Sequence, residues 1–135
     1  MAYRVEKRSP IDIEDRRAVG VALPFSSESV FKSTYRTIDA YRTNIINYLL
    51  TSKGERYFNP EFGNSLRDLL FEPGLNEIRK KSITTNLTRE LNYYFPKLVI
   101  DLIEISDKVD HVIQIYIKFH VKDSRLGDEL VINFE

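Results

Sequence analysis

The chain has 135 residues, enough for one ordinary domain with a single hydrophobic core. Twenty basic residues balance twenty acidic ones, and this zero net charge argues against a nucleic-acid-binding protein. Cysteine is absent, no apolar stretch is long enough to span a bilayer, and the first residues lack the apolar segment of a secretory signal. We therefore expect a protein that is made and kept in a cytoplasm, with no membrane partner.

Residues 1 to 33 show neither helical nor strand periodicity, and Pro10, Gly20 and Pro24 interrupt any regular element. A stretch of this length without periodicity is uncommon inside a compact domain. We interpret it as an N-terminal extended arm that becomes ordered against a neighbouring protein, with a frayed terminus as an equally good alternative. Residues 34 to 135 are then a single folded domain.

Two long helices and one short helix are expected in the first part of this domain. Apolar residues recur at helical spacing over about residues 37 to 51, with Thr37 as the N-cap and Gly54 just beyond the end. After a turn-rich stretch, Ser65 opens a capping-box pattern that predicts a short helix. The second long helix covers about residues 76 to 94 and is stopped by Pro96.

After Pro96 the apolar period changes to two, which is typical of strands. Residues 98 to 105 are almost continuously apolar, which predicts a well-buried strand. Residues 112 to 121 and 128 to 135 alternate, so each strand should turn one face to the core. The alternating apolar positions are Ile113, Ile115, Ile117, Leu130, Ile132 and Phe134. The predicted fold class is α+β, with helices followed by an antiparallel three-stranded sheet.

Three strands leave two open edges, and only the arm remains in the chain to cover them. Because open edges accept strands from other proteins, we predict strand addition at this sheet, with the six alternating apolar residues fixing its register. The alternative is that charged residues simply protect the edges. The candidates for protection are Lys118, Glu129 and Glu135.

The sequence carries no arrangement typical of an active site or a metal site. The histidines His111 and His120 lack paired spacing, and there is neither a phosphate-binding glycine loop nor a nucleophile motif. We therefore expect no catalytic residue, no metal and no cofactor. The remaining enzymatic alternative is a glycosidase-like pair of carboxylates, which helix ends and nearby arginines explain better as structural residues. The candidates are Glu55, Glu61, Asp68 and Glu72.

Two aromatic groups, Tyr57-Phe58 and Tyr93-Tyr94-Phe95, raise the alternative of stacking on nucleic-acid bases. Their neighbours are not basic enough to follow a phosphate backbone. We therefore interpret both groups as core residues.

Residues 46 to 72 carry a more specific pattern. The chain reads Ile46-Asn-Tyr-Leu-Leu-Thr-Ser-Lys-Gly54-Glu-Arg56, then Asn59-Pro60-Glu-Phe-Gly63, then Leu66-Arg-Asp-Leu-Leu-Phe71-Glu72-Pro73. This resembles the contractile-tail baseplate wedge family, which includes the sheath initiator of T-even-type phages and its type VI secretion counterpart. The resemblance covers roughly residues 35 to 125.

The same pattern has a physical interpretation as a rigid connection between two helices, which we call the elbow. Gly54 ends a helix, Gly63 permits a tight turn, and Arg56 is expected to pair with a carboxylate such as Glu61 or Glu72. The candidate structural residues of the elbow are Gly54, Glu55, Arg56, Pro60, Gly63, Phe71 and Glu72.

The resemblance implies a non-catalytic structural protein of the virion tail baseplate, made in the host cytoplasm and built into a multi-subunit, six-fold assembly. Its helical side would bind the wedge subunits around the tail tube, and its sheet would receive arms of the first sheath ring and so initiate sheath assembly. Family members often carry Glu-Pro-Arg after the long helix, where this chain has the wedge-binding candidates Phe95, Pro96 and Lys97. Relatives have been labelled lysozyme-like, so a peptidoglycan hydrolase is one alternative and a generic interaction module another.

Overall fold

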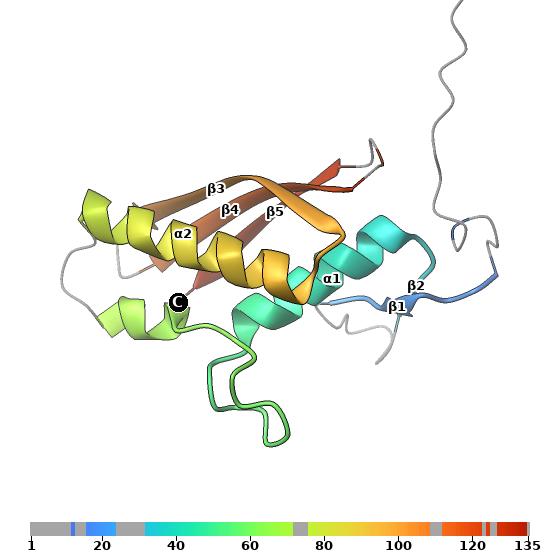
Figure 1. Ribbon diagram of the computed structural model, residues 1–135, viewed down its shortest axis with the longest axis horizontal. Coiled ribbons are helices and arrows are strands. Elements are labelled where there is room, and N and C mark those ends of the chain that lie inside the picture. Colours follow the sequence, from blue (N-terminus) through green and yellow to red (C-terminus); the bar gives the residue numbers. More distant parts are fainter. Residues whose placement is uncertain are drawn as a thin grey trace, which may run out of the picture.

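The computed structural model describes residues 12, 16–23, 32–71, 76–108, 112–122, 124 and 127–134, and of residues 69–71, 107 and 108 only the backbone. In chain order the elements are β1 (Gly20–Val21), β2 (Ser33–Thr34), α1 (Thr37–Leu50), the 3-10 helix η2 (Leu66–Phe71), α2 (Glu77–Tyr94), β3 (Leu98–Lys108), β4 (Val112–Val121) and β5 (Gly127–Phe134) (Figure 1). The α+β class with a C-terminal antiparallel three-stranded sheet is confirmed. Within the described ranges, no helix is long and apolar enough to cross a bilayer.

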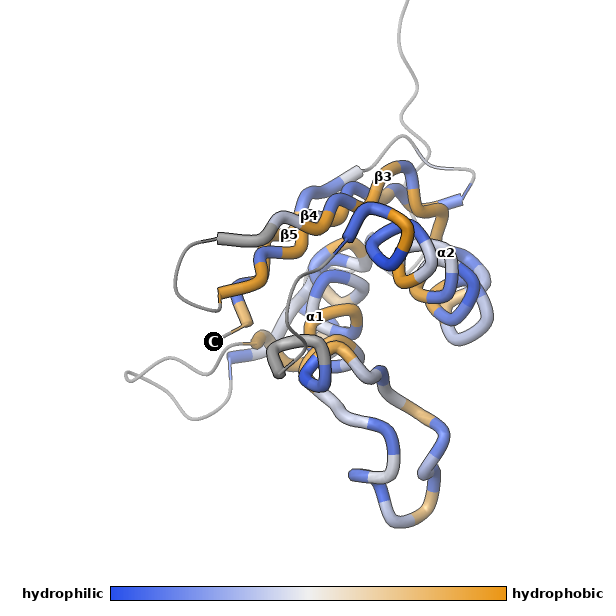
Figure 2. Tube along the Cα trace, turned by 90° about the vertical axis from the view of Figure 1, so that its left-hand side faces the viewer, coloured by the Kyte–Doolittle hydropathy of each residue, from blue (hydrophilic) through white to orange (hydrophobic). Residues whose placement is uncertain are grey.

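Both long helices lie on one side of the sheet (Figures 1 and 2). β4 is the middle strand, α2 packs along β3, and α1 packs along β5. The core therefore lies between one layer of helices and one layer of strands. Its most deeply buried side chains are Ile45, Tyr48, Leu49, Leu91, Ile115, Ile117 and Phe119.

The N-terminus of α1 is capped from a distant part of the chain. Thr37, the predicted N-cap, is instead the first helical residue. The Asp12 carboxylate accepts hydrogen bonds from the backbone N–H of Thr37 (2.7 Å) and from its hydroxyl (2.6 Å). A carboxylate at this position satisfies an unpaired N–H and is favoured by the helix dipole. The prediction of Thr37 is wrong because the acceptor lies 25 residues upstream, outside any local pattern.

Part of the predicted arm folds back onto the domain. β1 and β2 pair as antiparallel strands, extended by hydrogen bonds from Val19 N–H to the Thr34 carbonyl and from Ala22 N–H to the Lys32 carbonyl (both 2.7 Å). Both strands contact α1. Residues 1–11, 13–15 and 24–31 of the arm lie outside the described part of the chain. Ordering of the arm against another protein stays a prediction.

A β-bulge at Asp101 interrupts β3. Ile100 pairs with Phe119 and Leu102 with Lys118, so Asp101 is an extra residue without an opposite partner. Because side chains alternate along a strand, one extra residue exchanges the two faces beyond it. Core-facing positions are therefore even-numbered before the bulge and odd-numbered after it, and Leu102 is 43% exposed. The prediction of a strand buried on both faces is wrong here. The continuous apolar run consists of two segments, before and after the bulge, each of which buries only one face.

On the face of the sheet opposite the helices, polar side chains pair across neighbouring strands. Gln114 donates to Asn133 (3.0 Å), and His120 lies 2.9 Å from Asp101. Lys118 and Glu129, two of the predicted protecting charges, face each other at 3.9 Å. The third, Glu135, lies outside the described residues.

Candidate functional site

The loop of the elbow, residues 51–65, leaves α1, projects away from both layers and returns into η2 (Figure 1). Backbone hydrogen bonds join its two limbs at the base. Lys53 N–H donates to the Asn64 carbonyl (3.2 Å), and Asn64 N–H donates to the Thr51 carbonyl (3.0 Å). These paired bonds fix the direction in which the loop projects.

Two glycines of this loop adopt backbone angles that favour glycine. Gly54 has φ +86° and donates its N–H to the Pro60 carbonyl (2.7 Å), so it closes the loop at a second level. Gly63 has φ +120°, and a Cβ built there would lie 2.6 Å from the Thr51 carbonyl oxygen. No atom lies within 4 Å of the corresponding position at Gly54. Gly63 is therefore required for both conformation and space, and Gly54 for conformation alone.

A single buried side chain, that of Asn64, joins α1 to η2. Its Nδ2 donates to the carbonyls of Tyr48 (2.8 Å) and Leu49 (2.9 Å), which belong to the last turn of α1. Its Oδ1 accepts from the N–H of Leu66, the first residue of η2 (3.0 Å). The predicted capping role of Ser65 is wrong, because the residue before it supplies the acceptor. The preference of asparagine for helix starts was the available signal.

Arg56 stacks on an aromatic ring, whereas its predicted alternative partner Glu72 lies outside the described residues. Its guanidinium lies 3.9 Å from the centre of the Phe62 ring, and among the described residues it pairs with no carboxylate. Cation–π stacking therefore replaces the expected ion pair with Glu61. Glu55 accepts the Ser52 N–H (2.8 Å) and so holds the start of the loop. Of the remaining elbow candidates, the side chain of Phe71 and all of Glu72 lie outside the described part.

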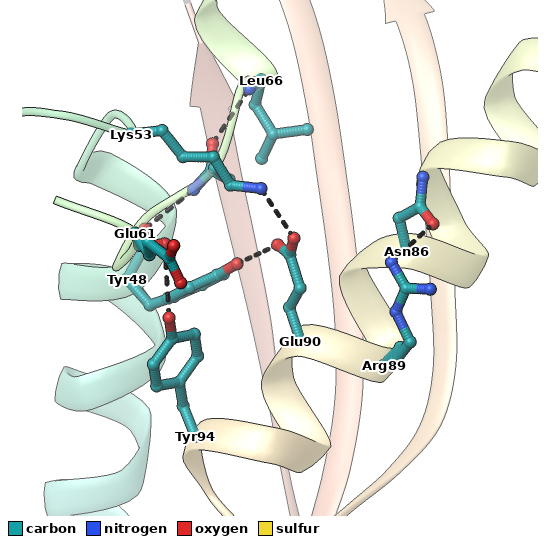
Figure 3. A network of polar contacts seen from close by, with 9 residues as sticks. Tyr48, Lys53, Glu61, Leu66, Asn86, Arg89, Glu90 and Tyr94 are labelled. Atoms are coloured by element: carbon teal, nitrogen blue, oxygen red, sulfur yellow. Dashed lines mark hydrogen bonds and ion pairs between the residues drawn. The ribbon is translucent and has the colours of Figure 1, made fainter.

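A cluster of aromatic rings attaches the loop to both helices. Phe62 of the loop lies edge-on to Tyr48 of α1 (5.3 Å between ring centres) and to Tyr94 of α2 (5.0 Å). The Tyr94 hydroxyl also donates to the Glu61 carbonyl (3.3 Å; Figure 3). The prediction that Tyr94 packs against the core is confirmed. It is wrong for Tyr93, which is 78% exposed.

A charged hydrogen-bond network runs alongside this cluster (Figure 3). The Tyr48 hydroxyl donates to one carboxylate oxygen of Glu90, and Lys53 Nζ lies 2.8 Å from the other. Burial, and then the bond to Glu90, raise the pKa of Tyr48 far above its ordinary value of 10.0. Partial burial alone would raise the pKa of Glu90, but the bonds from Lys53 and Tyr48 outweigh it and lower that pKa below 4.5. Glu90 is therefore ionised, with both oxygens engaged, at neutral pH.

This network predicts a pH dependence of folding. Because the Glu90 pKa is lower in the folded chain, Glu90 adds to the free energy of unfolding at neutral pH, and this contribution is lost as pH falls below 4.5. Because the Tyr48 pKa is higher in the folded chain, its contribution is lost as pH rises above 10.0. We expect Glu90→Gln to lower the free energy of unfolding by about 1 kcal/mol at pH 7. We also expect the free energy of unfolding of this variant to fall less steeply than that of wild type as pH drops below 4.5.

Urea unfolding between pH 3 and pH 11 tests this expectation. Glu77→Gln is the matched control, because Glu77 pairs with Lys80 on the surface of the same helix with its own side chain 87% exposed. If the free energy of unfolding of wild type and of Glu90→Gln fell equally at acid pH, Glu90 would not be the group responsible for the pH dependence.

The network divides the space between the loop and α2 into two hollows. The larger, about 500 Å³, is lined by Lys53, Pro60, Glu61, Arg89, Glu90, Tyr93 and Tyr94. The smaller, about 290 Å³, lies on the side of η2, and Lys53 and Glu90 line both. The chain folds so that two carboxylates, Glu61 and Glu90, border the larger hollow. Because a glycosidase also places two carboxylates at one cleft, this hollow is where a hydrolase site would be sought.

Two of the other sequence-derived carboxylates, Glu55 and Asp68, do not line the larger hollow. Asp68 lines the smaller hollow, Glu55 is bonded to the loop backbone, and Glu72 lies outside the described residues. Within the described chain, no group of three or more histidine or acidic side chains is placed to hold a metal ion. Of the two histidines, His120 lies on the polar face of the sheet and His111 is outside the described residues. Sequence reasoning missed Glu90, since nothing in its local pattern marks it.

The wedge-binding candidates form the turn between α2 and β3. Phe95 ends α2 and packs partly into the core. Pro96 and Lys97 are exposed, and the Lys97 carbonyl accepts the Lys122 N–H (2.8 Å), which ties the turn to the end of β4. Their role in binding stays a prediction.

The strand-addition candidates face the helices. Ile113, Ile115 and Ile117 belong to β4, whose two edges are already paired with β3 and β5. Leu130, Ile132 and Phe134 belong to β5 and pack in or against the core. Among the described residues the outer edges of β3 and β5 are unpaired. An added strand would therefore pair with the backbone of β3 or β5, and the candidate side chains would hold that backbone in register.

Comparison with known proteins finds one curated relative and several structures of similar fold. No protein-family model matches the chain. The chain is 30% identical over 86 residues to a protein of Enterobacteria phage T4 named "Baseplate wedge protein gp25". This match covers 62% of the chain and 63% of the phage protein, so it spans somewhat less than two thirds of that relative.

The solved structures that share the fold include the following two. A putative tail lysozyme from Geobacter sulfurreducens superposes with a TM-score of 0.62 at 22% identity, covering 70% of this chain and 86% of that one. A chain of the anti-feeding prophage baseplate, determined with six-fold symmetry, superposes with a TM-score of 0.54 at 15% identity, covering 84% of this chain and 81% of that one. At these identities the two structures support the fold itself.

Proposed function

We propose, starting from the relationship of this chain to the contractile-tail baseplate family, that it is a non-catalytic structural subunit of a tail baseplate. The observation that carries the proposal is the 30% identity to a phage baseplate wedge protein. That match is supported by a fold shared with a prophage baseplate chain over 84% of this chain. In this proposal the protein is made in the host cytoplasm and assembled with wedge, tube and sheath subunits in a six-fold baseplate.

Within the baseplate, we assign the subunit a connecting role. Its helical side and the exposed turn at Pro96 and Lys97 bind wedge subunits near the tail tube. Its sheet, whose outer edges on β3 and β5 are unpaired among the described residues, receives strands of the first sheath ring and initiates sheath assembly. The fixed loop of the elbow and the Tyr48–Glu90–Lys53 network support this role, because a connector must hold its two binding surfaces in a constant relative orientation.

A peptidoglycan hydrolase is the second candidate, favoured by Glu61 and Glu90 at one hollow and by the name of the Geobacter sulfurreducens protein. A glycosidase needs one carboxylic acid that keeps its proton, which requires a raised pKa. The pKa of Glu90 is lowered, and both its oxygens are already bonded. The hollow therefore supplies no general acid at Glu90, and we favour a structural role for the pair.

Both candidates are tested by removing the chain from cells that make the contractile particle. We expect tail tubes and baseplates without assembled sheath, and restoration of sheath by the wild-type chain and by Glu61→Gln. We also expect purified protein to release no soluble fragments from peptidoglycan. Normal sheath in the absence of the chain would refute the connecting role. Fragment release that disappears in Glu61→Gln would establish the hydrolase instead.

A further inference from the structure

Two large aromatic side chains stand in solvent at the far end of the elbow loop. Tyr57 is 90% exposed and Phe58 is 97% exposed, although the sequence predicts both as core residues. Their rings meet edge to face, with centres 5.2 Å apart. We call this pair the aromatic tip. Since each ring is almost fully hydrated, neither adds appreciably to burial within this chain.

The aromatic tip is carried on a fixed base. The Gly54–Pro60 hydrogen bond (2.7 Å) closes the loop just behind the two rings. Phe62 N–H donates to the Asn59 carbonyl (3.2 Å), and Arg56 stacks on the Phe62 ring. The loop is thus ordered before any partner arrives, so little conformational entropy remains to be lost when the rings are buried.

We propose that the aromatic tip is a docking anchor that inserts into an apolar pocket of another protein subunit of the assembly; this rests on the proposed function. Tyrosine and phenylalanine each bury roughly 150 to 250 Å² when enclosed. The pair therefore supplies about half of the roughly 800 Å² that one partner contributes to a standard interface. Such a pair acts as the centre of a larger contact, and the remainder comes from the flanks of the loop.

The charges around the aromatic tip favour a protein partner over a lipid surface. Lys53 and Arg56 are balanced by Glu55 and Glu61, so the loop has no basic excess. Aromatic loops that enter membranes are normally helped by basic residues that attract anionic headgroups. An apolar protein pocket with a mixed-charge rim matches the loop, because interface cores are apolar and their rims polar.

The test uses labelled full-length chain and baseplates purified from cells that lack it. Wild-type chain should bind these particles, and the double variant Tyr57→Ser with Phe58→Ser should bind about ten-fold or more weakly. Its thermal unfolding should match wild type, because both rings are almost fully exposed and gain little from packing on the described residues. Tyr35→Ser is the matched control: Tyr35 is 48% exposed in the segment between β2 and α1, outside the surfaces assigned to binding, and we expect binding within about two-fold of wild type. Equal binding of wild type and double variant would overturn the proposal.

A second measurement identifies the occupant. With benzoylphenylalanine at position 58, irradiation of the reconstituted particle should cross-link the chain to one other baseplate polypeptide. A cross-link only to a second copy of this chain would overturn the proposal, as would tip-dependent binding to phosphatidylglycerol vesicles. Failure of the wild-type chain to bind any particle would refute the baseplate function itself, which separates that outcome from failure of the tip alone.

Discussion

Gly63→Val should be the most destabilising single substitution in the elbow, with a loss of about 3 to 5 kcal/mol in the free energy of unfolding. Gly63 has φ +120°, which a β-branched residue adopts only with strain. The new Cβ would also meet the Thr51 carbonyl oxygen at 2.6 Å and the Ser52 carbonyl carbon at 2.9 Å. Both are backbone atoms held by the hydrogen bonds at the base of the loop, so relief requires opening that base. Urea unfolding monitored by tyrosine fluorescence measures the loss.

Gly54→Ala separates the cost of an unfavourable φ from the cost of a steric clash at the new Cβ. Gly54 has φ +86° with no atom within 4 Å of its Cβ position, so alanine meets only the conformational cost of about 1 to 2 kcal/mol. If Gly63→Ala were no worse than Gly54→Ala, the close approach of the Thr51 carbonyl would have no energetic weight.

Proline in β5 should have the largest effect on sheath initiation. Along an edge strand, successive N–H groups point alternately to the paired neighbour and to the open edge. Of the adjacent variants Val131→Pro and Ile132→Pro, one therefore breaks the pairing with β4 and the other removes a donor from the free edge. We expect the variant that loses only the free-edge donor, whichever of the two it is, to keep most of its stability, while its sheath initiation falls about ten-fold or more.

The comparison within this pair is its own control. Thermal unfolding of the isolated chain shows which proline is tolerated, and sheath counts by electron microscopy then report on that variant alone. Sheath at wild-type frequency with the tolerated proline would argue against strand addition at β5. Truncation after Gly127 is a poorer test, because it removes the buried Leu130 and Phe134 and so damages the core.

The elements could be predicted from the sequence wherever the determining contacts are local. Asn76 caps α2 through Arg79, three residues away, and the alternation of β4 gives its buried face directly. The cap of α1 could not be predicted, since Asp12 reaches Thr37 across 25 residues. The bulge at Asp101 could not be predicted either. The bulge moves the core-facing positions to the other face of β3, so the apolar residues before and after it read as one continuous apolar run in the sequence.

The elbow was predicted as a unit, but its chemistry was not. The positive φ angles of Gly54 and Gly63 follow from residue type, which a sequence displays. The partner of Arg56 depends on which group the folded loop brings near it, and that group is the Phe62 ring. Glu90 joins the network only because α2 lies beside the end of α1, which is information held in tertiary packing alone.

Because of the bulge at Asp101, the two edge strands of the sheet differ in how well an added strand can pair with them. β5 offers eight residues whose pairing with β4 runs in unbroken register, so a strand laid beside it can form one continuous ladder. β3 is divided by the bulge, where local twist increases, so a strand laid there meets one ladder of three residues, 98–100, and one of seven, 102–108, out of phase. The two edges of the described sheet are therefore not equivalent, and β5 offers the longer uninterrupted one. In the proposed connecting role, this difference favours β5 as the edge at which a sheath strand would be added.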